Sequence, residues 1–197
     1  MAARDIMPWT SPFGGHPRMQ WFRMNAGEVF FEGEPVSVNQ DGELTESLAA
    51  GPVDSDLLGI AAGGPGATNI NPATGITYAT GDLIPVFMPD IGNYFITRNW
   101  TAGTAFNDVA PAVADIGDQV GLVNIGGLWG IDQGQDQNEG LCTVIDILDE
   151  NKNSIQQTGA TVSTADGNRL DAPAYFVVFS MGSTQLRVAG EVNAPIA

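Results

Sequence analysis

Carboxylates are the only side chains with acid–base chemistry that this chain carries in number. Its 197 residues include 23 Asp and Glu, but a single histidine, His16, and a single cysteine, Cys142. General acid–base and nucleophilic catalysis rely mostly on His, Cys, Lys and Tyr groups whose pKa values are tuned by their neighbours. The composition therefore argues against an ordinary enzyme.

The acids form patterns that two kinds of chemistry use. Glycoside hydrolysis needs two carboxylates about 5–9 Å apart, and residues 132–139 place oxygen ligands at alternating positions, loosely as a calcium loop does. The loop lacks the Asp-x-Asp opening, the sixth-position glycine and the twelfth-position glutamate of a calcium loop, and acid pairs arise by chance in so acidic a chain. We therefore predict solvated charges, with no catalytic residue, no metal site and no cofactor, at each acidic group: Asp54/Asp56, Asp115/Asp118, residues 132–139, and Asp146/Asp149/Asn151.

Length and charge limit the other classes of function. The chain is 43% hydrophobic with a net charge of −16, which suits one domain, or one domain with an arm or a small second lobe. A field of this sign repels phosphate backbones. The longest apolar stretch, residues 175–181, is too short to span a bilayer, and the opening residues lack the apolar core of a secretory signal. We expect neither a nucleic-acid nor a membrane partner.

The spacing of apolar runs predicts the elements that must carry any site. From Val29 onward, short runs rich in β-branched and aromatic residues recur about every 8–12 residues between Gly, Pro, Asn and Asp, as in all-β domains. The Asp41-Gly42 pair predicts a hairpin turn, and Pro85 inside a strand predicts an edge or a bulge. Residues 107–118 are the best helix candidate, shortened to a turn or two by Pro111 and Gly117. Strands are predicted at residues 33–38, 57–62, 75–80, 83–88, 94–97, 120–125, 128–131, 141–148, 175–179 and 185–188.

The first residues differ in charge and composition from the rest. Residues 1–24 hold three arginines and one acid, whereas the remaining chain holds four Lys and Arg against 22 acids. Three prolines and a Gly-Gly pair are expected to interrupt any helix or strand ladder there. Large apolar side chains are nevertheless frequent, so we expect an extended arm that packs against its own body or a neighbouring subunit. The predicted organisation is an extended N-terminal arm (1–27), a β-rich barrel- or sandwich-like body with little helix (28–150), and a C-terminal β extension on the same body (151–197).

Three successive segments resemble a pattern in the capsid decoration, or cement, proteins of tailed bacteriophages. The pattern runs from Gly33-Glu34-Pro35-Val36, through Leu58-Gly59-Ile60-Ala61, to Gly81-Asp82-Leu83-Ile84-Pro85-Val86. Residues 115–122 and 129–132 also look like the second half of such domains, so the resemblance covers roughly residues 28–150.

The resemblance implies a β-rich virion structural protein without enzymatic activity. Members of this family are often trimeric and clamp neighbouring capsid subunits at local threefold positions. By the resemblance, the partner of this chain would be the major capsid protein of a phage head. The chain would form a homotrimer and would lie on the capsid surface of the virion after assembly in the host cytoplasm.

The arm has the composition of a protein interface, since interfaces are enriched in Trp, Phe, Met and Arg and poor in Lys. We therefore expect residues 1–24 to lie across a neighbouring subunit, with aromatic anchors and with arginines that meet acidic partners. The predicted anchors are Trp9, Phe13, Trp21 and Phe22, and the predicted arginine contacts are Arg4, Arg18 and Arg23.

Three other interpretations remain open. A phage fibre or spike, or a carbohydrate-binding β-module, would use the loops at residues 63–74 or 132–140, with or without calcium. A major capsid subunit would need a long spine helix and a longer chain, and the sequence predicts neither. A polysaccharide hydrolase would depend on acids such as Asp132 or Asp136.

Overall fold

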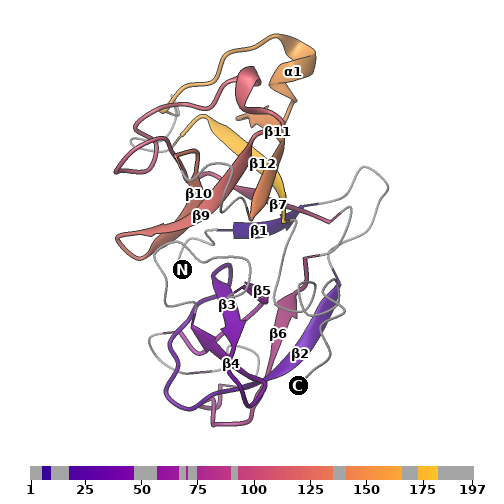
Figure 1. Cartoon of the computed structure of the whole chain (residues 1–197), viewed down its shortest axis with the longest axis vertical. Coiled ribbons are helices and arrows are strands. Elements are labelled where there is room, and N and C mark those ends of the chain that lie inside the picture. Colours follow the sequence, from indigo (N-terminus) through magenta and orange to yellow (C-terminus); the bar gives the residue numbers. More distant parts are fainter. Residues whose placement is uncertain are drawn as a thin grey trace.

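The computed structural model describes residues 6–9, 18–46, 57–66, 70, 75–89, 93–134, 141–165 and 173–181. The all-β prediction is confirmed: strands form a seven-stranded sheet and, below it in Figure 1, a closed barrel. The strands are β1 (Ile6–Trp9), β2 (Met19–Met24), β3 (Pro35–Val38), β4 (Glu43–Glu46), β5 (Gly59–Ala61), β6 (Leu83–Phe87), β7 (Tyr94–Thr97), β8 (Trp100–Thr101), β9 (Gln119–Ile125), β10 (Leu128–Asp132), β11 (Cys142–Asp149) and β12 (Tyr175–Met181). Between the strands, the described residues also form a 3-10 turn, η2 (Val113–Asp115), and a short helix, α1 (Ile155–Thr158).

The barrel closes in the order β2-β4-β3-β5-β6. Strands β3 and β4 form the hairpin predicted at Asp41-Gly42, and the Gly42 N–H donates to the Asn39 carbonyl at 3.0 Å. The three segments of the decoration-protein resemblance lie on or beside β3, β5 and β6, which are consecutive strands of this barrel. Its interior holds a core of Met24, Phe30, Val36, Leu44, Leu58, Ala61, Tyr78, Ile84, Val86 and Met88.

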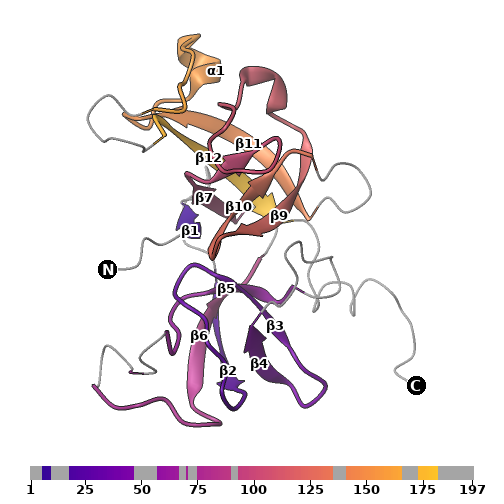
Figure 2. The ribbon, with the colours of Figure 1, turned by 90° about the vertical axis from the view of Figure 1, so that its left-hand side faces the viewer.

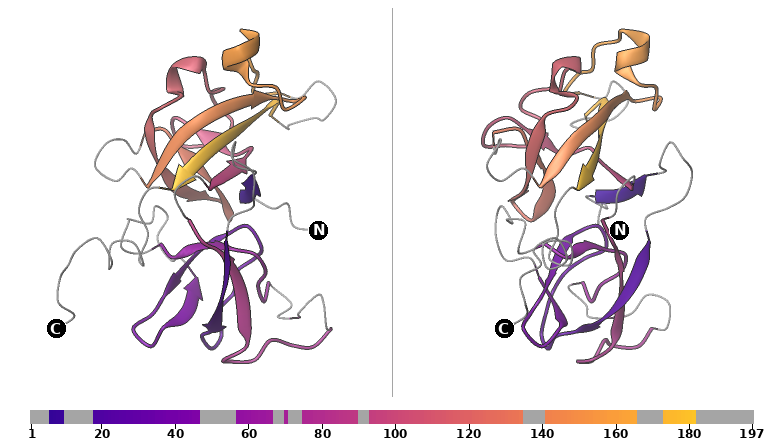
Figure 3. Two further views of the ribbon diagram at one scale, coloured as in Figure 1. Left: turned by 90° about the vertical axis from the view of Figure 1, so that its right-hand side faces the viewer. Right: turned by 45° about the vertical axis from the view of Figure 1, so that its right-hand side comes forward.

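The larger sheet has the order β1-β7-β12-β11-β9-β10-β8. Its two long strands, β11 and β12, pair antiparallel with a register shift at Ile145, and α1 lies beyond one end of them (Figure 3). One face of the sheet covers the main core, which includes Trp100, Trp129 and Tyr175. The other face carries a smaller cluster around Ile96, Leu148, Phe176 and Val178.

Strand β5 joins the two units, as Figure 2 shows. Leu57 and Ile60 pack in the main core under the larger sheet, whereas Leu58 and Ala61 pack inside the barrel. All three residues of β5 are buried for this reason. At Gly59, an added Cβ would lie 2.5 Å from the Phe87 carbonyl oxygen, so only glycine lets β6 approach this closely.

The expectation that the first 24 residues carry no strand is wrong. Residues 6–9 form β1, paired with β7, and residues 19–24 form β2 of the barrel. Pro8 is tolerated because β1 is an edge strand, where a missing N–H can face solvent. The two sheets also draw strands from all three predicted ranges: β1 and β2 from 1–27, β3 to β11 from 28–150, and β12 from 151–197.

Other local predictions had mixed outcomes. Residues 107–118 contain only the single turn η2, in line with the shortened helix that was predicted. Residues 75–80 form no strand: Thr77 makes an isolated bridge with Ile70, and the Ala79 N–H donates to Asp82 Oδ2 at 2.8 Å in the turn before β6. The predicted strand at 185–188 lies outside the described residues.

Candidate interface on the barrel

The outer face of the β2–β6 pair carries exposed apolar side chains. Along β2 the side chains alternate, so that Met19, Trp21 and Arg23 point outward while Met24 is buried. Trp21 is 61% exposed, Met19 52% and Leu83 of β6 55%. We call the set of Met19, Trp21, Arg23, Leu83 and Pro85 the Trp21 face.

The register of the two strands explains why these side chains lie together. The Met24 N–H donates to the Asp82 carbonyl at 2.9 Å, and the Met88 N–H donates to the Arg18 carbonyl at 2.8 Å. Since hydrogen-bonded and non-hydrogen-bonded pairs alternate in an antiparallel ladder, Trp21/Pro85 is a non-hydrogen-bonded pair. Opposed side chains come closest in such pairs. Arg23/Leu83 and Met19/Phe87 are pairs of the same kind.

Pro85 was predicted to mark an edge or a bulge, and it marks neither. Strand β6 lies between β2 and β5. The Pro85 carbonyl accepts the Ala62 N–H at 2.8 Å, one residue beyond the end of β5. Because the N and O of a strand residue point the same way, the missing N–H of Pro85 faces the place where β5 ends. The reciprocal hydrogen bond of the Ala62/Pro85 pair, from residue 85 to the Ala62 carbonyl, is the one that proline cannot make, and β5 ends at Ala61.

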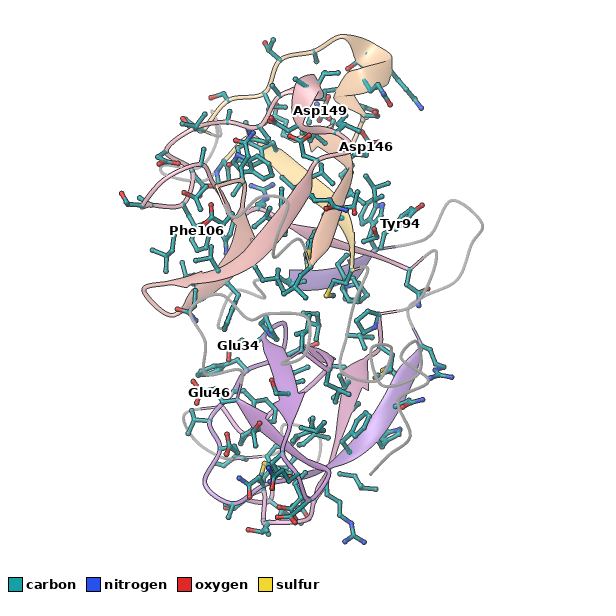
Figure 4. The ribbon with its side chains drawn as sticks, viewed as in Figure 1. Glu34, Glu46, Tyr94, Phe106, Asp146 and Asp149 are labelled. Atoms are coloured by element: carbon teal, nitrogen blue, oxygen red, sulfur yellow. The ribbon has the colours of Figure 1, made fainter. Side chains whose placement is uncertain are left out.

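The charge of this region contrasts with the rest of the molecule. Arg23 lies on the Trp21 face and the exposed Arg18 immediately precedes it, and neither guanidinium forms an ion pair with a described residue. Glu43 is the partner of Arg23 in the β2–β4 register. The labelled acids Glu34 and Glu46 lie on the other flank of the barrel in Figure 4. The Trp21 face is therefore apolar, with Arg18 and Arg23 at one margin and Glu43 next to Arg23.

A fixed turn precedes the β6 side of this face. The Asp82 carboxylate accepts the Ala79 N–H, and the Asp82 N–H donates to the Ala79 carbonyl at 3.0 Å. Gly81 adopts a φ of +87°, in the region that favours glycine. Burial, with the Asp82 charge, raises the pKa of Tyr78, whose ring belongs to the barrel core. Leu83 is thus presented from a rigid scaffold.

The predicted interface residues do not all lie on one surface. Trp21 and Arg23 lie together on the barrel, with Arg18 next to them in sequence. Phe22 points inward and packs, partly buried, against the barrel core. Phe13 and Arg4 lie outside the described residues.

Trp9 belongs to the other unit. It lies on β1 directly opposite Tyr94 of β7, and the Lys152 ammonium lies 5.3 Å from the centre of its ring. Sequence reasoning missed Leu83 as a neighbour of Trp21, because only the register of β2 on β6 brings the two strands together. The alternation within residues 19–24 was the signal that separates Trp21 from Phe22.

Two acids of the predicted groups, Asp115 and Asp132, accept hydrogen bonds in turns. Asp115 accepts the Ala112 N–H and the Gln133 side-chain amide, and Asp132 accepts the Gly134 N–H. No three His, Cys, Asp or Glu residues of the described ranges are grouped so that they could hold a metal ion. Within the same ranges, no helix has the length and apolarity needed to cross a membrane. Asp54, Asp56 and Asp136 lie outside the described residues.

Comparison of the chain with models of protein families, with curated proteins and with solved structures gave no match.

Proposed function

We propose that this chain is a non-enzymatic structural protein of a phage virion, which binds the outside of the capsid as a cement protein through its Trp21 face. The observation that carries the proposal is an indole 61% exposed on a closed barrel, with Leu83 and Arg23 beside it. Trp and Arg are the residue types that dominate binding energy at protein interfaces. The resemblance of residues 33–36, 58–61 and 81–86 to decoration proteins supplies the kind of partner.

Charge complementarity supports the choice of surface. The molecule carries a net charge of −16, so most of its surface repels an acidic partner. Arg18 and Arg23, at the margin of the Trp21 face, are the only Lys or Arg among the described residues of the barrel. We assign to this face an acidic, partly apolar patch of the major capsid protein. A homotrimer placed at a local threefold position would present three such faces to the shell.

The first experiment is cosedimentation with empty heads of the virus that encodes the chain. Trp21→Ala should weaken binding at least about 30-fold, since anchors of this kind contribute about 2 kcal/mol or more. Leu128→Ala is the matched control, because Leu128 is 45% exposed on the other unit. Unchanged binding by Trp21→Ala, with stoichiometric binding by the wild type, would contradict the proposed face. No binding by the wild type would contradict the cement role.

The oligomeric state provides a second, independent test. Light scattering coupled to size-exclusion chromatography should give a mass of three chains. A monomer at all concentrations would count against the homotrimer and leave capsid binding to be judged by cosedimentation. The fibre or carbohydrate-module alternative predicts binding to a glycan surface in place of empty heads.

A further inference from the structure

The outer face of the seven-stranded sheet holds a pocket of about 250 Å³ that the proposed capsid contact does not use. Its floor is apolar, formed by Ile145, Leu148 and Val178. Trp9 and Tyr94 form an aromatic wall, since they are directly opposed residues of β1 and β7. Asp146 and Lys152 complete the lining with one negative and one positive charge.

The backbone of the lysine at the rim is held in place by the turn that carries it. Lys152 has a φ of +64°, and its N–H donates to the Asp149 carbonyl at 2.9 Å. The Asp149 carboxylate accepts the N–H groups of Asn151 and Asn153 at 2.9 and 2.8 Å. These bonds keep the pKa of Asp149 below its ordinary value. The Lys152 ammonium thereby reaches the rings of both Trp9 and Phe176.

The carboxylate at the rim is also oriented. One oxygen of Asp146, Oδ1, accepts the Ser154 hydroxyl at 2.8 Å and the Ile147 N–H at 2.8 Å. The other oxygen, Oδ2, has no hydrogen-bond partner among the described residues. Figure 4 shows Asp146 and Tyr94 on the same flank of the larger unit. An oriented carboxylate and a lysine ammonium thus border one aromatic wall.

We propose that this pocket binds a single neutral pyranose unit of a glycan. A pyranose ring has an apolar C–H face that packs on an aromatic ring, here Tyr94, and hydroxyls that both donate and accept hydrogen bonds. One hydroxyl of the sugar can donate a hydrogen bond to Asp146, and another can accept one from Lys152. Because these two charges have opposite signs, the pocket favours a neutral ligand over an acidic one. Pockets that combine an apolar lining with a few placed polar groups are typical of small-ligand sites, and this volume suits one ring.

An apolar side chain of a partner protein is the competing occupant. It would fill the same volume, but it would leave the free oxygen of the half-buried Asp146 without a hydrogen-bond donor, which costs binding energy when that oxygen is desolvated. A sugar hydroxyl can donate to that oxygen, and another can accept from Lys152. The observations therefore favour the saccharide.

Saturation-transfer NMR on the full chain tests the assignment, with methyl glycosides of glucose, galactose, mannose and N-acetylglucosamine as probes. We expect at least one glycoside to bind with a Kd on the order of 1 mM, as for a ligand of about a dozen heavy atoms. N-acetyl-leucinamide is the probe for the competing occupant. The proposal would be overturned if this amide bound and no glycoside did. It would also be overturned if no probe showed saturation transfer.

Three variants locate the site. Tyr94→Phe keeps the ring and should bind like the wild type, whereas Tyr94→Ala should lose at least about tenfold in affinity. Asp146→Asn keeps the acceptor for Ser154 and Ile147 but removes the free carboxylate oxygen, so it should weaken binding severalfold without changing the melting temperature. Glycoside binding that survives both Tyr94→Ala and Asp146→Asn would contradict the pocket.

The proposal stands apart from the capsid contact. Trp21→Ala should leave glycoside binding unchanged, and Tyr94→Ala should leave head binding unchanged. Each test therefore fails or succeeds independently of the other. If both proposals hold, the same molecule binds the capsid through its barrel and carries a sugar-binding pocket on its larger unit.

Discussion

Trp21 on β2 lies directly opposite Pro85 on β6, in a non-hydrogen-bonded pair of the barrel ladder. The most exposed aromatic side chain of β2 therefore lies opposite the pyrrolidine ring of Pro85, which has no N–H to donate. Neither residue is needed for the barrel's interior, whose core lies on the other face of both strands. Trp21 is 61% exposed, and this pair therefore places a large apolar surface on the outside of the described barrel.

The alternation of β2 predicts a sharp difference between neighbouring aromatic residues. Phe22→Ala should lower the free energy of unfolding by about 1–3 kcal/mol, because its ring packs against the barrel core. Trp21→Ala should change it by less than about 0.5 kcal/mol, as is usual for exposed positions. Urea denaturation followed by far-UV circular dichroism measures both. A larger loss for Trp21→Ala than for Phe22→Ala would contradict the assigned faces of β2.

Gly59 predicts a second stability difference, with a glycine control nearby. In Gly59→Ala the new Cβ would meet the Phe87 carbonyl oxygen at 2.5 Å and Val86 Cγ1 at 2.8 Å, so β5 and β6 must separate. We expect a loss of about 2 kcal/mol or more. In Gly63→Ala the nearest atom lies at 3.7 Å, and stability should change little. Thermal unfolding of the two variants compares them, and equal melting temperatures would argue against the tight β5–β6 approach.

Tyr175 predicts a loss of stability at alkaline pH. Its hydroxyl donates to Asn107 Oδ1 at 2.8 Å, and burial, with the Asp108 charge, raises its pKa. A raised pKa in the folded state means that the contribution is full below the ordinary value of about 10 and is lost as the pH rises above it. Tyr175→Phe should cost about 1 kcal/mol at pH 7. It should also flatten the decline of unfolding free energy between pH 9 and pH 11.5, which denaturant titrations at several pH values measure; an unchanged slope would contradict the assignment.

Asp149 predicts the opposite pH dependence. Because backbone N–H donors keep its pKa low in the folded state, the turn is stabilised above the ordinary Asp value of about 3.9 and loses this as the pH falls through the folded value. An NMR titration of the carboxyl carbon should give a pKa below that ordinary value. Amide exchange at Asn151 and Asn153 should accelerate in Asp149→Ala. A carboxyl that titrates at or above the ordinary value would refute the role of Asp149 in holding Lys152.

The sequence predicted local pairings better than distant ones. The Asp41-Gly42 turn connects the β3–β4 hairpin, and the strands predicted at residues 120–125 and 128–131 form the β9–β10 hairpin, because turn chemistry and strand alternation are encoded within a few residues. The arm was misjudged because its prolines were taken to exclude strands. Whether a proline is tolerated depends on which side of the strand lacks a partner, and for Pro8 and Pro85 this is set by distant strands.

For the candidate sites too, local features could be predicted from the sequence and contacts between distant strands could not. The composition of residues 1–24 indicated a contact surface, and the alternation of β2 separates Trp21 from Phe22. Nothing local places Leu83 beside Arg23 or Tyr94 opposite Trp9, since these pairs arise from the register of β2 on β6 and of β1 on β7. The predicted anchors Trp9 and Trp21 consequently belong to different sheets.

The central claim is that the barrel binds a capsid through the Trp21 face. Electron cryo-microscopy of empty heads incubated with the wild-type chain tests it most directly. We predict added density at local threefold positions, oriented so that Trp21 and Leu83 contact the shell while β11 and β12 face away. Heads without added density, or density in which the Trp21 face points to solvent, would contradict the claim.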